Sequence, residues 1–258
     1  MRCSSTAIRR RESDRDSDAA NTVHHTLRLF RAVCRHLSLR ADPCLAAIAP
    51  IRRVDLKAAE ILKANGRLPV HPPPALLGAV PGVEVGDEFI YRIELAIVRL
   101  HRPPENGIDY DTVTGLATSI VVSDRFLDSW NVSDGLLSYI GMGGFGGRKV
   151  EPKDQKMEKG NLALKRSMDA KKPVRVIYGI RDFKRNTASV FFYDGLYIVE
   201  ECKKVIGSND CFLFEFQLRR MEGQRRCEKW ETLFEKKKVW GWKQLRSACD
   251  SGKKVLAK

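Results

Sequence analysis

The sequence predicts an α+β fold, in which an N-terminal pair of helices precedes a domain built on a curved, barrel-like β-sheet with a few helices. Two patterns predict it. Between residues 21 and 66 the apolar side chains recur at helical spacing, whereas from residue 80 onward they form short or alternating runs separated by turn residues, as β-strands do. A chain of 258 residues with 43% apolar side chains can bury a core in one or two domains, which argues against wholesale disorder.

The first seventy residues are expected to comprise a disordered leader and a helical pair. Residues 1–20 are polar and of mixed charge, which predicts disorder. The helical pair occupies residues 21–70. On its first helix, five apolar residues share one side at spacings of three and four: Val23, Leu27, Phe30, Cys34 and Leu37.

The second helix of the pair is shorter. It is predicted to begin at Asp55, a residue type that caps helix N-termini, and to end at Gly66, a residue type that commonly follows a helix. Leu56, Ala59 and Leu62 would share one side of it. Because neither helix can bury its apolar side alone, we expect the pair to pack on the domain that follows.

The domain predicted over residues 71–224 is rich in strands. Its one convincing helical stretch is Asn161–Met168. The runs that predict strands are Glu88–Val98, Ser119–Val122, Val174–Tyr178, Ser189–Tyr193, Tyr197–Val199 and Cys211–Leu218.

The formal charge of +14 lies entirely in the two flanks of the chain. Residues 1–70 hold 14 basic and 7 acidic side chains, residues 224–258 hold 11 and 4, and the middle is balanced. The excess favours a polyanionic partner, either nucleic acid or an anionic membrane surface. The basic tail, residues 225–258, also carries aromatic residues for which burial against the sheet and stacking on nucleic acid both stay open: Trp230, Phe234, Trp240 and Trp242.

The sequence lacks the residues that several classes of function require. No apolar run approaches eighteen residues and the N-terminus has no apolar leader, which argues against a membrane span and a secretory signal. The seven cysteines and five histidines are too scattered for a metal site. The glycine-rich run Gly141–Arg148 lacks the Lys-Ser/Thr end of a phosphate-binding loop, and Asp109 with Asp111 fits a solvated loop better than an acid/base pair. We therefore expect neither catalysis nor a cofactor.

Five longer strings follow one another in a fixed order: Gly78–Asp87, Gly107–Tyr110, Asp154–Leu164, Pro173–Gly179 and Tyr193–Tyr197. Together they resemble the SRA domain, also called YDG, which binds methylated cytosine in DNA. The resemblance covers residues 78–224 and is nearest to the plant SUVH-type histone methyltransferases. The pre-SET zinc cluster and the SET catalytic domain of those enzymes have no counterpart in this sequence.

The resemblance implies a mechanism and a pocket. SRA domains rotate the modified cytosine out of the duplex and hold it between two aromatic rings without performing chemistry on it. The rings fall on Phe126 and Tyr139, and Asp128 falls on the carboxylate that accepts a hydrogen bond from the cytosine amine. Ile140 follows the second ring, where a main-chain contact is expected. Without the resemblance, core packing is the other interpretation of both rings.

A loop that enters the duplex from the other side is also implied by the resemblance, and it matches His101–Gly107. Glu105 or Asn106 lies at its tip; Asn106 is the better candidate to fill the space left by the base, because phosphates would repel the carboxylate of Glu105. From position and charge alone, we expect Arg148, Lys149 and Lys153 to contact phosphates.

The sequence thus predicts a non-enzymatic, chromatin-associated DNA-binding module of the nucleus, whose partner is duplex DNA containing 5-methylcytosine. Chromatin proteins are further candidate partners, and a membrane is not. The alternative is a chromatin interaction or scaffold protein with a degenerate pocket, which binds nucleic acid non-specifically or binds a protein. A purely electrostatic binder loses affinity with salt and ignores the methyl group, which separates the two hypotheses.

Overall fold

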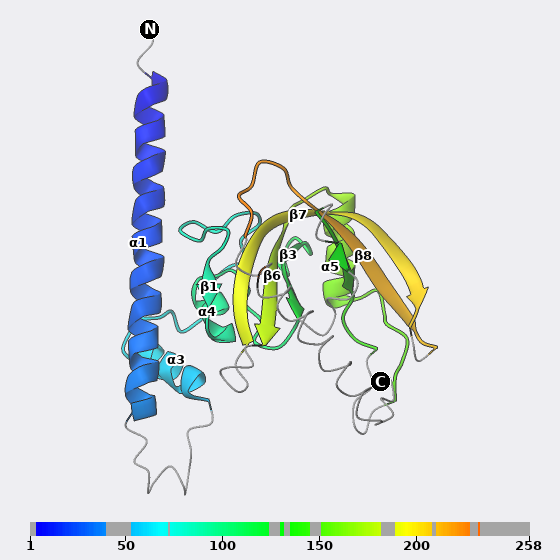
Figure 1. The fold of residues 1–258 in the computed structure, drawn as a ribbon, viewed down its shortest axis with the longest axis horizontal. Helices are drawn as coiled ribbons and strands as arrows, with labels where there is room; N and C mark the ends of the chain where they lie inside the picture. The colour runs from blue at the N-terminus through cyan, green and yellow to red at the C-terminus, as the bar shows by residue number, and fades with distance from the viewer. Residues whose placement is uncertain are drawn as a thin grey trace, which may run out of the picture.

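The computed structural model describes residues 4–39, 53–71, 73–123, 130–131, 135–144, 151–181, 189–207, 210–227 and Thr232 (Figure 1). Within these ranges the helices are α1 Ser4–Leu39, α3 Val54–Ala64, α4 Arg92–Ile97 and α5 Lys159–Asp169. The strands of the same ranges are β1 Glu88–Phe89, β2 Ile108–Tyr110, β3 Ala117–Ser123, β4 Trp130–Asn131, β5 Leu136–Ile140, β6 Val174–Arg181, β7 Ser189–Ile206 and β8 Phe212–Arg220.

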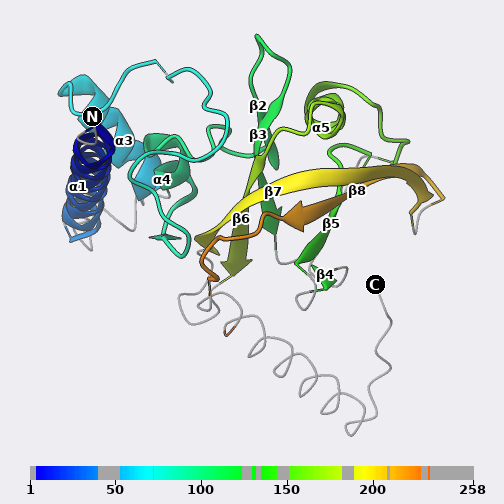
Figure 2. The ribbon, with the colours of Figure 1, turned by 90° about the horizontal axis from the view of Figure 1, so that it is seen from above.

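The described strands form one mixed sheet in the order β2-β3-β6-β7-β8-β5-β4, with β1 paired to β7. Strands β3 and β6 are parallel, and the other neighbours are antiparallel. Strand β7 arches across the whole sheet (Figures 1 and 2). It bends at two register shifts, one beside Asp194 and one beside Glu200, as β-bulges do. The two strands that the sequence predicts here are therefore one, and Gly195, with φ of +115°, allows the first bend.

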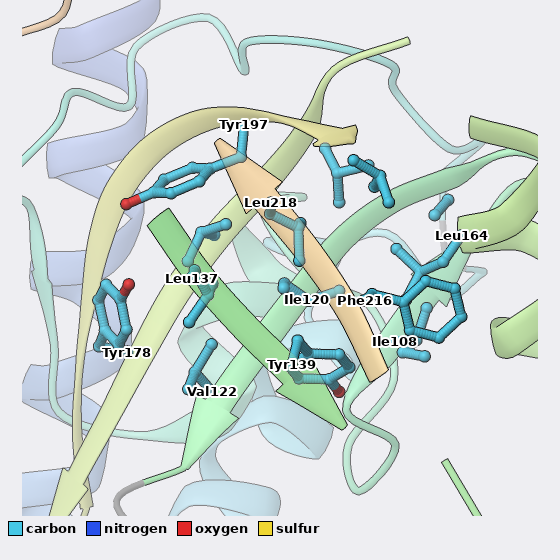
Figure 3. Close-up of a cluster of buried hydrophobic side chains, with 14 of the residues drawn as sticks. Ile108, Ile120, Val122, Leu137, Tyr139, Leu164, Tyr178, Tyr197, Phe216 and Leu218 are labelled. Carbon is cyan, nitrogen blue, oxygen red and sulfur yellow. The ribbon is translucent and has the colours of Figure 1, made fainter. Parts of the chain in front are cut away.

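The main core lies inside the curve of the sheet (Figure 3). It joins apolar side chains from six strands and from α5, so the sheet wraps around its own core and confirms the predicted α+β class. Representative members are Ile108, Ile120, Leu137, Leu164, Tyr178, Tyr197 and Phe216.

The helical pair, α1 with α3, packs on the domain through α4. Phe30 and Cys34 of α1 and Leu62 of α3 share one buried cluster, against which Tyr91 at the N-cap of α4 packs. An ion pair reinforces this contact. Glu94 of α4 is fully buried, and both its oxygens accept hydrogen bonds from Arg31 of α1, at 2.7 and 2.9 Å. The predicted packing of the pair on the following domain is confirmed.

The ends of the helical pair differ from the sequence-based expectation. Helix α1 begins at Ser4, within the segment 1–20 that the sequence predicts to be disordered; residues 4–39 contain neither glycine nor proline, and a helix can therefore run through a polar stretch. Asp55 lies in the first turn of α3 and bonds the side chain of Arg53, so it does not cap the helix. Leu56 is exposed, and Ala58 takes its place beside Ala59 and Leu62 in the buried set.

The strand predicted over Glu88–Val98 is wrong. Only Glu88–Phe89 forms a strand, and Arg92–Ile97 forms α4. The alternation of apolar residues misleads because α4 lies between two cores. Leu95 packs into the cluster that faces the sheet, whereas Ile93 packs against the helical pair. A short helix that is covered on both sides therefore carries apolar residues at strand-like intervals.

Candidate nucleic-acid interface

A pocket of about 310 Å³ opens between the loop Glu105–Gly107 and the ends of β3 and β5. This volume lies in the range of small-molecule sites. Strand β3 contributes Val121–Ser123, and β5 contributes Ser138–Ile140 followed by Gly141–Gly143. Arg92, the first residue of α4, completes the lining. The pocket thus joins segments that are distant in sequence.

Tyr139 belongs both to the main core and to the pocket. Tyr139 is 9% exposed, it shares the inner face of β5 with Leu137, and it is drawn at the edge of the core in Figure 3. A Cβ atom at Gly107 would lie 2.5 Å from the Tyr139 hydroxyl oxygen, so glycine is required for the loop to approach the ring this closely. Burial raises the pKa of Tyr139, which keeps the phenol neutral. Core packing and pocket lining are therefore not exclusive for this ring.

Two buried amide side chains fix the first part of the glycine-rich run. Gln155 Nε2 donates to the carbonyls of Gly141 and Gly143, at 2.7 and 2.9 Å. Asn161 pairs with the backbone of Met142, accepting at 2.7 Å and donating at 3.0 Å. These contacts explain why the string Asp154–Leu164 matters, and sequence reasoning missed both residues. The signal available was an amide side chain at each of two positions in the string Asp154–Leu164, at the start of the predicted helix and shortly before it.

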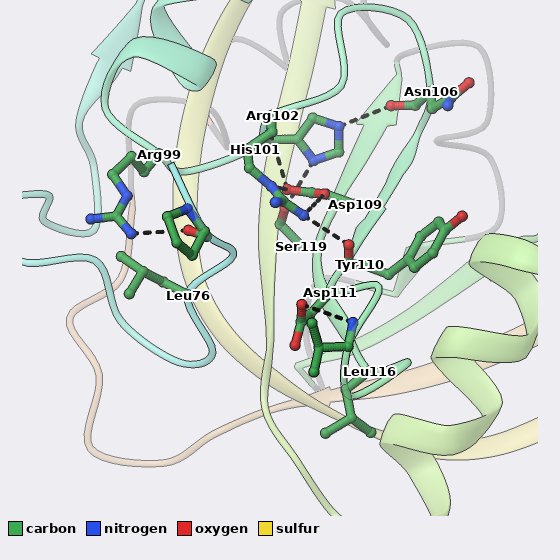
Figure 4. Close-up of polar contacts among 12 residues, drawn as sticks. Leu76, Arg99, His101, Arg102, Asn106, Asp109, Tyr110, Asp111, Leu116 and Ser119 are labelled. Atoms are coloured by element: carbon green, nitrogen blue, oxygen red, sulfur yellow. Dashed lines mark hydrogen bonds and ion pairs between the residues drawn. The ribbon is translucent and has the colours of Figure 1, made fainter. Parts of the chain in front are cut away.

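The opposite wall of the pocket is held by polar contacts around the loop (Figure 4). Arg102 forms a double hydrogen bond with Asp109, with Nη2 to Oδ1 at 2.8 Å and Nε to Oδ2 at 3.0 Å, which closes the base of the loop. Asp109 is 3% exposed, so the prediction of a solvated loop at this residue is wrong. The hydrogen bonds from Arg102 hold its pKa below the usual value despite the opposing effect of burial. Asp109 therefore has a structural role.

The structure brings four of the predicted site residues to one pocket: Glu105, Asn106, Tyr139 and Ile140. Lys153 is exposed, and its amide donates to the Gly144 carbonyl at 3.1 Å, so it lies beside the glycine-rich run. Phe126, Asp128, Arg148 and Lys149 lie outside the described residues.

The described part of the chain holds neither a metal-ligand cluster nor a membrane-spanning helix. Its histidine, cysteine and carboxylate side chains form no group of three that could hold a metal ion. None of its helices is long and apolar enough to cross a membrane.

A model of the SAD/SRA domain family matches residues 76–224, which include all walls of the pocket. The chain belongs to this family. Its sequence is 39% identical over 241 residues to the H3 lysine-9 specific histone-lysine N-methyltransferase SUVH5 of Arabidopsis thaliana, covering 88% of this chain and 29% of SUVH5. It is 41% identical over 230 residues to SUVH6 of the same plant, covering 82% of this chain and 28% of SUVH6. The chain therefore spans under a third of the length of these relatives.

Solved structures agree with this family membership. KRYPTONITE in complex with mCHG DNA and SAH matches with a TM-score of 0.66 at 32% identity, covering 81% of this chain and 44% of that one. The SUVH5 SRA domain in complex with hemimethylated CG DNA matches with a TM-score of 0.51 at 47% identity, covering 58% and 97%. The resemblance to SRA domains inferred from the five strings is confirmed.

Proposed function

We propose that this SRA-family chain is a DNA-binding module that recognises methylated cytosine in duplex DNA by accepting the base, rotated out of the stack, into its pocket. The observation that carries the proposal is the pocket itself. Tyr139 and the loop Glu105–Gly107 form its walls, in a chain whose relatives KRYPTONITE and SUVH5 have been crystallised with methylated DNA.

The free-energy cost of rotating a base out of the duplex is close to the gain from the contacts that the pocket offers. Rotating a base out of the duplex costs a few kcal/mol, and stacking on an aromatic face returns about 1–3 kcal/mol per base. Tyr139 offers one face, and in this proposal Phe126 supplies the other while Asp128 accepts from the cytosine amine. Phosphate contacts by Lys153, together with Arg148 and Lys149, supply the remainder.

The proposed activity is binding and not catalysis. The family match is to the SRA region, and the SRA domain of the relative SUVH5 has been crystallised with DNA. We assign it to chromatin in the nucleus, where methylated DNA lies. The competing function is a scaffold with a degenerate pocket, which would bind DNA through charge alone.

A competition binding experiment with matched duplexes, one carrying 5-methylcytosine and one unmodified, tests the proposal. Burial of one methyl group is worth about 0.8 kcal/mol, so we expect at least about a fourfold preference for the methylated duplex. Asp128→Ala should remove the preference. Tyr139→Phe, which keeps the ring, is the matched control and should retain it. Equal binding of both duplexes by the intact protein would overturn the proposal.

A further inference from the structure

We propose that Arg92 and His101 are positioning residues of this site, which hold the loop Glu105–Gly107 against the pocket by binding a single backbone carbonyl, that of Asn106. The consequence for DNA rests on the proposed function. The holding contact itself is a property of the free protein, so the two can be tested separately.

Both side chains converge on the same oxygen atom. Arg92 Nη2 donates to Asn106 O at 2.6 Å, and His101 Nε2 lies 2.9 Å from that oxygen. The Asn106 side chain is exposed, whereas its carbonyl points inward to the histidine (Figure 4). The loop is therefore anchored through its backbone, which leaves the side chains of Glu105 and Asn106 available to a ligand.

The histidine is held in its neutral form by its surroundings. His101 is 1% exposed, and its Nδ1 lies 2.8 Å from the hydroxyl oxygen of Ser119 on β3. Burial first, and then the charge of Arg92, lower its pKa to about 3, so the ring is neutral at physiological pH. Nε2 lies 2.9 Å from Asn106 O and 3.1 Å from Arg92 Nη2. In the tautomer in which the Ser119 hydroxyl donates to Nδ1, the proton is on Nε2 and is directed at Asn106 O; in the other tautomer, Nε2 accepts from Arg92 and orients the guanidinium that donates to the same carbonyl.

The position of Arg92 favours a role in holding the Asn106 carbonyl over a role in stability. Its guanidinium lies over the Phe191 ring, 5.6 Å from the ring centroid, and it lines the pocket. Within the described residues its Nε is buried without a hydrogen-bond partner, and it belongs to none of the ion pairs. Arg92 is therefore a half-buried cation whose contacts are the Asn106 carbonyl, His101 and the Phe191 ring, and the carbonyl that it holds is what ties it to the pocket.

Arg99 provides a matched control. Its Nη2 also donates to one backbone carbonyl, that of Pro74 at 2.9 Å, and its Nε is likewise buried without a partner among the described residues. It differs in what it holds, because Pro74 is not part of the pocket lining. Arg92→Met and Arg99→Met therefore remove the same kind of contact from two different segments.

The holding contact is tested in the free protein by amide hydrogen exchange. The Val121 amide donates to Gly107 O at 2.8 Å and so reports on the base of the loop. We expect its exchange to accelerate by about tenfold in Arg92→Met and in His101→Ala, as the loss of one hydrogen bond implies. Arg99→Met should leave it unchanged, and His101→Gln, which restores a donor near the Nε2 position, should recover most of the protection. Unchanged exchange in Arg92→Met and His101→Ala would overturn the inference.

The consequence for binding is tested with the same variants and the two matched duplexes. Arg92→Met should weaken binding of the methylated duplex by about tenfold and reduce the methyl preference, while Arg99→Met keeps both. If the intact protein discriminates and Arg92→Met discriminates equally well, the inference fails. If the intact protein does not discriminate, the proposed function fails, and the exchange experiment alone decides whether the loop is held as stated.

Discussion

Two arginines, the buried Arg175 and the half-buried Arg92, mark two regions of the molecule that use the same side chain differently. Arg175 of β6 is 1% exposed and donates to three backbone carbonyls: those of Leu76, Gly78 and Leu100. Arg92 donates to one carbonyl, on a loop that lines a pocket. Burial lowers the pKa of both, for Arg175 to about 10, so both remain charged at neutral pH. The number and place of the acceptors separate a residue that fixes the fold from one that shapes a site.

The region around Arg175 ties the start of the domain to the sheet. Its three acceptors lie in the segment before β1 and at the end of α4, and the side chain crosses from β6 to reach them. A second buried polar group lies elsewhere on the sheet, where Asp194 accepts from the Tyr197 hydroxyl and lies 3.5 Å from Arg220 Nε. The three contacts of Arg175 join distant segments inside the fold, which is typical of structural polar networks.

The largest expected effect is on the stability of the fold, in the region around Arg175. Arg175→Met leaves three backbone carbonyls, one buried and two partly buried, without their donor, so we expect the free energy of unfolding to fall by about 4 kcal/mol. Urea denaturation followed by circular dichroism measures it. A loss below about 1 kcal/mol would mean that the three contacts do not fix this region.

The pH dependence of stability tests the state of His101, beside the loop that lines the pocket. The folded pKa of His101, about 3, lies below its unfolded value of about 6.5, so protonation favours the unfolded chain and stability falls as pH drops from about 6.5 toward 3. Arg92 and Arg175 oppose protonation of this ring, and Asp109 favours it. Between pH 7 and pH 5 we expect a loss of about 2 kcal/mol, measured by urea denaturation at each pH. His101→Gln should lack this part of the slope; an identical slope in that variant contradicts the assignment.

A smaller effect on stability is expected at Arg92. Arg92→Met removes one carbonyl contact but also a half-buried cation that has no ion-pair partner within the described residues, so the free energy of unfolding should change by no more than about 1 kcal/mol. The same urea assay measures it. A loss as large as that of Arg175→Met would erase the distinction between the two regions.

The smallest expected effect is on DNA affinity, from deletion within the basic C-terminal tail. Deleting residues 228–258 removes nine basic and four acidic side chains. We expect this to weaken the binding of methylated and unmodified duplexes equally and to reduce the salt dependence, because charge binds phosphates without reading bases. Isothermal titration at two salt concentrations measures both. A change in the ratio of the two affinities would place part of the selectivity outside the pocket.

The sequence predicts β3, β6, β8, the two halves of β7, and α5, because each has a distinct apolar run. It misses β2, β4 and β5, which are strands of only two to five residues. It fails at α4, where Leu95 and Ile93 face different cores, and that information lies in the tertiary structure. At the site, family resemblance locates Tyr139 and the loop tip. Arg92, His101 and Gln155 escape it, because each acts on a backbone carbonyl 5 to 14 residues away, and the residue type alone does not reveal the acceptor.

The most direct test of the central claim asks whether a base leaves the stack when the protein binds. A duplex with 2-aminopurine beside a single 5-methylcytosine becomes more fluorescent when its neighbour is unstacked. We expect the intact protein to raise this fluorescence at saturation, and Tyr139→Ala to raise it much less because the stacking face is lost. Saturation of the duplex by the intact protein without any rise in fluorescence would contradict the account.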